Sequence, residues 1–134
     1  MTRHFKILFT FLLAAVLFEA CKKDDIPVDE DGLLITTRAE CAVTNFELVG
    51  ADFVTVRSKV PAIDTVAQTV NVEVLFGTDL KNVYPQFTLS SDCKLEPKIT
   101  GKVDLSDLAN PKKYTVVSGN RQVRKTYTLL VKYQ

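Results

Sequence analysis

The chain has 134 residues, of which 46% are hydrophobic and 25% are charged, and its formal net charge is +1 at pH 7. This length and composition indicate one globular domain, and exclude a two-domain enzyme, a multi-span membrane protein and a disordered tail. The only histidine is His4, and tryptophan is absent.

The first twenty residues have the pattern of a secretory signal peptide. Arg3 and Lys6 precede an almost wholly apolar run over residues 7–18. This run is shorter than the roughly 20 residues that span a bilayer, but it fits the apolar region of a signal peptide. A buried helix is the alternative, and the lack of a polar face argues against it. We predict that residues 1–20 are removed.

The end of this segment resembles a bacterial lipobox, in which a small residue precedes a cysteine that becomes lipidated. Here Ala20 precedes Cys21, and Lys-Lys-Asp-Asp follows. Phe18 and Glu19 depart from the commonest pattern, but the whole run is similar to lipoprotein signals of Bacteroidetes. The resemblance implies that lipidated Cys21 anchors the chain in the outer membrane. The acidic residues that follow resemble the export signal of that phylum, which implies that the protein faces the cell exterior.

Three segments follow from this interpretation: a signal peptide (1–20), an acidic tether (21–33) and a domain (34–134). The acidic residues and Pro27 of the tether favour an extended linker. Removing residues 1–20 leaves fifteen bases and fifteen acids, and a chain without net charge gives no indication of nucleic-acid binding. Residues 94–134 nevertheless carry nine bases and three acids. A solvated strand face or an anionic partner would explain this excess.

Cys41 and Cys93 remain once Cys21 is lipidated. In an exported protein two cysteines are readily bridged, so a disulfide between them is one expectation. Two buried thiols that pack as small apolar groups are the alternative. Neither a CxxC motif nor a histidine is present in the mature chain. We therefore expect no metal site, no cofactor and no thiol redox chemistry.

From Leu33 onward the hydrophobic pattern alternates with the period of β-strands. In residues 69–76, Val70, Val72, Val74 and Phe76 share one face. The pattern of residues 113–133 predicts a hairpin that turns at 118–121. We expect this hairpin to lie in the opposite sheet from the strand over residues 69–76, so that the apolar residues of the two face each other.

Weaker strand patterns cover residues 44–49, 53–58, 86–90 and 94–102. About seven short strands predict an all-β, immunoglobulin-like sandwich, and a small barrel is the alternative. Five aromatic residues are expected on the apolar side of their strands: Phe46, Phe76, Phe87, Tyr127 and Tyr133.

The residues that catalysis requires are scarce in the mature chain. It contains no histidine for a Ser-His or Cys-His arrangement, no G-x-S-x-G and no phosphate-binding glycine loop. Acid pairs such as Asp104 and Asp107 occur, but scattered surface acids are common. We predict no catalytic residues and no enzyme activity. Tyr84, in a predicted loop before Pro85, is the best candidate for ligand contact, or else it plugs the end of the sandwich.

Several motifs in residues 41–133 resemble immunoglobulin-like domains of Bacteroidetes surface lipoproteins. The most specific are Gly77-Thr78-Asp79-Leu80 and the Tyr-Thr pairs at Tyr114 and Tyr127. In that group the domain stands between a lipid anchor and a larger domain tied to carbohydrate metabolism. The resemblance implies an accessory or spacer module, with a glycan or another surface protein as partner. Asp64-Thr65-Val66 also resembles an O-glycosylation acceptor of this phylum, which implies modification of Thr65.

Two other functions fit the same pattern. A structural subunit of a pilus-like or adhesin assembly would need an open edge or a donor strand, for which residues 127–133 are the best candidate. The second possibility is that the chain is a truncated N-terminal fragment of a larger carbohydrate-metabolism protein, because the sequence stops directly after the last predicted strand.

Overall fold

A computed structural model describes residues 26–134, so the predicted signal peptide and Cys21 lie outside the described residues. The described part is all-β and contains no helix. Its strands are β1 (Val43–Val49), β2 (Ala62–Asp64), β3 (Thr69–Val74), β4 (Tyr84–Leu89), β5 (Lys94–Glu96), β6 (Lys113–Val117) and β7 (Arg124–Tyr133).

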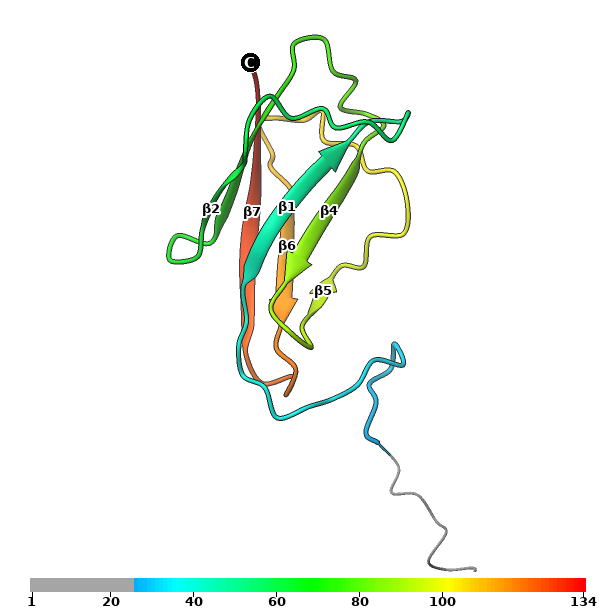
Figure 1. The fold of residues 1–134 in the computed structure, drawn as a ribbon, viewed down its shortest axis with the longest axis vertical. Helices are drawn as coiled ribbons and strands as arrows, with labels where there is room; N and C mark the ends of the chain where they lie inside the picture. Colours follow the sequence, from blue (N-terminus) through cyan, green and yellow to red (C-terminus); the bar gives the residue numbers. More distant parts are fainter. Residues whose placement is uncertain (1–25) are drawn as a thin grey trace, which may run out of the picture.

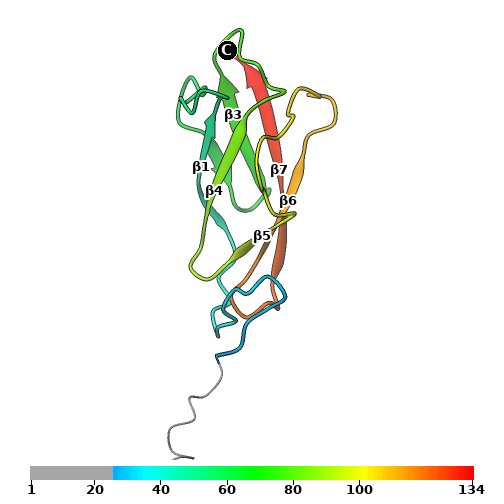
Figure 2. The same cartoon turned by 90° about the vertical axis from the view of Figure 1, so that its right-hand side faces the viewer.

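The strands form two sheets that pack as the layers of a sandwich, as predicted (Figures 1 and 2). One sheet contains only β1 and β4, which are antiparallel. The other has the order β2-β3-β7-β6-β5. Its central strand, β7, is parallel to β3, and the other neighbouring strands are antiparallel.

The core lies between these sheets and follows from the alternation of apolar residues. Val70, Val72 and Val74 on β3 are all buried, while Asn71 between them is exposed. A chain of aromatic contacts crosses the core. The Phe46 and Phe87 rings are 4.8 Å apart, and the Phe87 and Tyr114 rings are 5.0 Å apart. Such pairs stabilise a core beyond the area that they bury.

The closing hairpin is confirmed, but its predicted partner was wrong. Val117 pairs with Arg124 at the turn end of β6 and β7. However, β3 pairs with β7 in the same sheet, with Val70 beside Leu129. A two-residue alternation shows which face of a strand is buried, but it does not show which strand lies beside it. The layer opposite β7 is the β1–β4 pair.

The central place of β7 also corrects the donor-strand hypothesis. One edge of β7 pairs with β3 over residues 128–133, and the other edge pairs with β6 over residues 124–128. Residues 127–133 are therefore already built into a sheet of this domain and are not an unpaired donor strand.

Two aromatic residues predicted on the apolar side are exposed. Strand β3 ends at Val74, so Phe76 lies in the following turn with 87% of its surface exposed. Gly77 permits this turn through its φ of +84°. Tyr133 is 41% exposed at the end of β7, and its hydroxyl donates to the carbonyl of Thr78.

The strand predicted at residues 53–58 is also wrong. Thr55 forms an isolated bridge to Val49 in one sheet, and Arg57 forms one to Val74 in the other. Residues 53–58 therefore cross from one sheet to the other and form no continuous strand pairing with either sheet. The additional strand is instead β2, whose three residues pair with the start of β3.

The two ends of the described chain lie at opposite ends of an elongated molecule (Figures 1 and 2). The segment that begins at residue 26 packs beside the β6–β7 turn, whereas Gln134 lies at the far end. We call these the base and the distal end.

Candidate functional site

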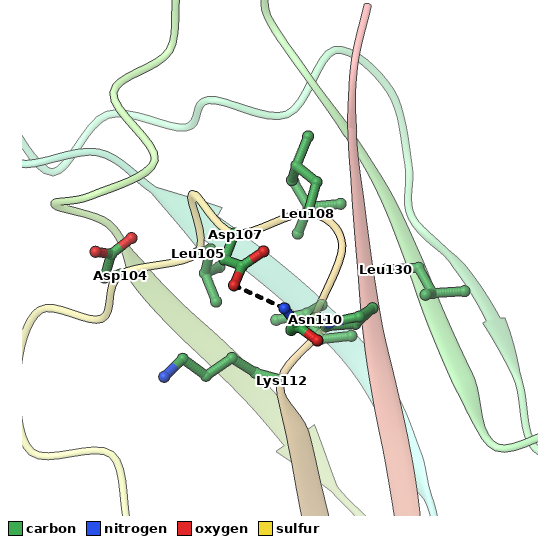
Figure 3. Close-up of a pocket in the computed structure, with 10 residues that line it drawn as sticks. Asp104, Leu105, Asp107, Leu108, Asn110, Lys112 and Leu130 are labelled. Atoms are coloured by element: carbon green, nitrogen blue, oxygen red, sulfur yellow. Dashed lines mark hydrogen bonds between the residues drawn. The ribbon is translucent and has the colours of Figure 1, made fainter.

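A pocket of about 430 Å³ lies between the 104–112 segment and the second half of β7 (Figure 3). Backbone hydrogen bonds hold the start of this segment, from Val103 N to Val83 O at 2.8 Å and from Leu105 N to Leu80 O at 2.7 Å. Four polar side chains line the pocket: Asp104, Asp107, Asn110 and Lys112.

The two acids of this pocket are hydrogen-bond acceptors with nearby partners. Asp107 accepts from the Asn110 amide at 2.9 Å (Figure 3). Asp104 accepts from the hydroxyl and the backbone N–H of Ser106. These hydrogen bonds lower the pKa of Asp104, and the charges of Lys81 and Lys112 lower it further. An ionised Asp104 can accept a ligand hydroxyl, but it is poorly suited to act as a general acid.

Tyr84, the predicted ligand contact, is half-buried at the start of β4. Its ring stacks on Phe53 with centroids 4.9 Å apart and an interplanar angle of 20°. Phe53 is 71% exposed, so it presents the outer ring of the pair to solvent. The structure therefore adds Phe53 to the candidate contact.

The sequence pattern did not indicate the role of Phe53, because it predicted a strand over residues 53–58. Phe53 has a φ of 60°, a left-handed value that is rare for a bulky residue. A tight turn imposes it, in which Gly50 N donates to Val54 O and Phe53 N donates to Gly50 O. In the sequence, only Gly50 indicated that a strand ends here, and it gave no information on where the Phe53 ring points.

The tether that was predicted to be extended is folded from Val28 onward. Val28 bridges Leu34, and the Asp29 carboxylate is buried with 4% of its side chain exposed. Asp29 Oδ2 lies 3.0 Å from Lys94 Nζ and 3.1 Å from Arg121 Nε. We call Asp29, Lys94 and Arg121 the base clamp, because they join the N-terminal segment to β5 and to the β6–β7 turn.

The charges of the base clamp are mutually stabilised. Burial alone would raise the pKa of Asp29, but hydrogen bonds from Lys94 and from the N–H groups of Leu33 and Asp31 hold it well below its usual range. The hydrogen bond with Asp29 in turn raises the pKa of Lys94. The clamp is therefore charged at neutral pH, with each buried ion paired, as buried charges must be.

Cys41 and Cys93 are free thiols in this structure. Cys41 Sγ lies 3.1 Å from the carbonyl of Val116, and Cys93 Sγ lies 3.1 Å from that of Glu40. Burial raises the pKa of both thiols, which makes them weak nucleophiles at neutral pH. A bridge in the exported protein stays a prediction.

Thr65 is exposed in the turn between β2 and β3. The Asp64 carboxylate fixes this turn by accepting from Val66 N and Ala67 N, both at 2.9 Å. Within residues 26–134, no helix is long and apolar enough to cross a bilayer. The same residues contain no cluster of three or more His, Cys, Asp or Glu side chains that could hold a metal.

Two solved structures from Bacteroides share this fold. One is a protein described as a "putative glycoside hydrolase" from Bacteroides thetaiotaomicron, with a TM-score of 0.60 and 25% identity over 81% of this chain and 28% of its own. The other is a DUF4623 family protein from Bacteroides eggerthii, with a TM-score of 0.51 and 17% identity over 71% of this chain and 22% of its own. This chain thus spans about a quarter of the length of either protein. No curated protein matches the chain closely enough to suggest a function.

The fold and the comparisons define a β-sandwich domain that also occurs as a part of longer Bacteroides proteins. The model of the family described as "SGBP, N-terminal" matches residues 51–131, which is more than half of the sequence, so the chain belongs to this family. The resemblance to N-terminal domains of glycan-related Bacteroidetes proteins is thereby confirmed.

Proposed function

We propose that this protein is a non-catalytic, lipid-anchored module on the outer face of the outer membrane, which acts as an accessory spacer in glycan handling. The observation that carries the proposal is the placement of the base and the distal end at opposite ends of an elongated sandwich (Figure 1). A domain with this geometry holds whatever it presents at its distal end away from its point of attachment.

The base clamp supports this role because it shortens the free part of the tether. If lipidated Cys21 is the anchor, only residues 22–28 lie between it and the buried Asp29. Seven residues reach at most about 25 Å, whereas the twelve residues of a tether up to residue 33 would reach about 43 Å. The clamp thus keeps the base close to the membrane and restricts how the domain can tilt.

The aromatic pair supports glycan contact at the distal end. Sugar rings pack against flat aromatic faces, and Phe53 exposes such a face while Tyr84 supports it from behind. In this proposal, Tyr84 positions the ring and Phe53 touches the ligand. Modification of Thr65 is a separate proposal, supported by the exposure of its turn.

Labelling of intact cells tests both the anchor and the orientation. An epitope placed after Gln134 should be accessible to antibody on intact cells that express the full chain. The Cys21→Ala variant should lose this surface label and leave the detergent-rich phase. An epitope that becomes accessible only after permeabilisation would contradict the proposed orientation, and unchanged partitioning of Cys21→Ala would contradict the anchor.

A glycan array with the full chain in detergent tests the accessory role. Phe53→Ala should weaken binding to any glycan that the protein retains, whereas Phe76→Ala, which also removes an exposed ring, should not. Failure to bind any glycan, together with failure to co-purify with any outer-membrane protein, would contradict the role in glycan handling.

A further inference from the structure

A groove of about 320 Å³ runs between the 97–104 segment and the start of β6. Four lysine side chains line it, and all four belong to exposed residues: Lys98, Lys102, Lys112 and Lys113. We call this the lysine groove. Asp104 is the one carboxylate in its lining, and its hydrogen bonds are made with Ser106.

The ion pairs of the molecule set these lysines apart. Residues 26–134 contain thirteen lysines and arginines, and seven of them lie within 4.0 Å of a carboxylate. Six form no such pair in the described part of the chain: Lys81, Lys98, Lys102, Lys112, Lys113 and Lys125. Four of these six line the lysine groove. A solvated strand face would not concentrate unpaired charge in one concave place.

We propose that the lysine groove binds an anionic polysaccharide through its carboxylate or sulfate groups. A row of like charges in a concave surface focuses the electrostatic potential and raises the local concentration of an anionic ligand. All four cations are lysines, which act as point charges and do not require the planar, bidentate geometry that arginine favours. The groove is therefore suited to a repeating anion whose charged groups vary in geometry.

The lining of the groove argues against two other polyanions. Its single aromatic residue, Tyr114, is 4% exposed, so it offers no face on which the bases of a single-stranded nucleic acid could stack. Lys98 lines a second pocket together with Asp31 of the N-terminal segment, so one end of the groove lies near the base. The other end, with Lys112 and Lys113, lies at the start of β6, away from the β6–β7 turn of the base (Figure 1). Lipid headgroups next to the anchor would meet the base first. The choice of a polysaccharide among polyanions rests on the surface position proposed above.

Binding of dextran sulfate, compared with neutral dextran of equal length, tests this site. The full chain in detergent should bind dextran sulfate and polygalacturonate but not dextran, and the affinity should fall as salt is added. Lys98→Gln/Lys102→Gln should weaken binding of dextran sulfate about five- to twentyfold, since exposed ion pairs are individually weak. The matched control, Lys125→Gln/Lys132→Gln on β7, removes the same charge and should weaken binding less than about twofold. Circular dichroism should show all of these proteins to be folded.

Three results would overturn the proposal. Equal loss in the two double variants would show that only net charge matters. Equal binding of dextran and dextran sulfate would show that charge does not select the ligand. Binding to vesicles of anionic phospholipid, without binding to either anionic polysaccharide, would assign the groove to a membrane. These measurements use purified protein, so they are independent of the cell-labelling test of the proposed orientation.

Discussion

Asp29 joins the N-terminal segment to the rest of the domain through ion pairs with Lys94 and Arg121. In the sequence it is one of several acids in a polar stretch. In the structure it is buried between a lysine and an arginine that lie 65 and 92 positions further along the chain. No local pattern distinguishes it from Glu30 or Asp31, because its burial depends on how the distant β5 and β6–β7 turn assemble.

We expect Asp29→Asn to lower the stability of the full chain, because it leaves Lys94 and Arg121 without their buried counter-charge. Glu30→Gln is the matched control. It removes a charge that also lies near Lys94, at 3.5 Å, but from a side chain that is 81% exposed. Urea unfolding followed by circular dichroism should show a clear fall in midpoint for Asp29→Asn and almost none for Glu30→Gln. Equal midpoints for the two variants would show that the clamp does not hold the base.

The same residue predicts how stability depends on pH. The pKa of Asp29 is lower in the folded chain than its usual value of 3.8. Its contribution is therefore fully present above about pH 5, and is lost as the pH falls through 3.8 toward the folded-state pKa. The difference in midpoint between wild type and Asp29→Asn should shrink between pH 5 and pH 2. A constant difference over this range would contradict the charged clamp.

Whereas the buried carboxylate of Asp29 has partners, the buried hydroxyl of Tyr127 has no hydrogen-bond partner in the described part of the chain. Removing an unpartnered buried hydroxyl is neutral or stabilising. Tyr127→Phe should therefore leave the free energy of unfolding unchanged or raise it by about 1 kcal/mol. Tyr127→Ala should lower it by about 3–5 kcal/mol through loss of the ring. A loss above 1 kcal/mol in Tyr127→Phe would show that the hydroxyl is satisfied in solution.

At the scale of the elements, the alternation of apolar residues predicted much of what β3, β6 and β7 bury. Val70, Val72, Val74 and Leu129 are all buried, as their positions in the alternation indicate. The same pattern could not show that β3 and β7 are parallel neighbours. Pairing between strands more than fifty residues apart depends on the whole topology, and the two-residue period is the same for every choice of partner.

The candidate site was harder to predict than the sheets. Tyr84 was identified because it precedes a proline in a predicted loop, although in the structure it begins β4. Its partner Phe53 depends on a left-handed backbone in a tight turn. The lysine groove was visible only as an excess of bases in the last third of the sequence. Which of those bases are paired depends on side-chain positions in the folded chain, as Lys94 in the base clamp illustrates.

The last strand supplies the sharpest test of which residues face inward. Leu129 is 2% exposed, whereas the side chain of Lys132 is 69% exposed. Leu129→Ala should cost about 2–5 kcal/mol, a large fraction of the roughly 5–15 kcal/mol that stabilises a small domain. Lys132→Ala should change the free energy of unfolding by less than about 0.5 kcal/mol. Urea melts of the two full-chain variants compare them directly, and similar midpoints would contradict the packing of β7.

At the scale of the whole molecule, the base clamp, the sandwich and the exposed aromatic pair are arranged along one axis. The clamp fixes the N-terminal segment, the two sheets give length, and the distal end carries Phe53. We propose that, through this arrangement, the anchored protein holds its distal end away from the membrane.

Energy transfer in liposomes measures directly how far the base and the distal end lie from the membrane. The lipidated full chain would carry a donor dye at Gln134→Cys or at Gln122→Cys in the β6–β7 turn, with Cys93→Ser to leave only the buried Cys41. Acceptor lipids would mark the membrane surface. We expect efficient transfer from position 122 and much weaker transfer from position 134. Equal transfer from both positions, or stronger transfer from position 134, would show that the domain lies flat or inverted, and would contradict the spacer role.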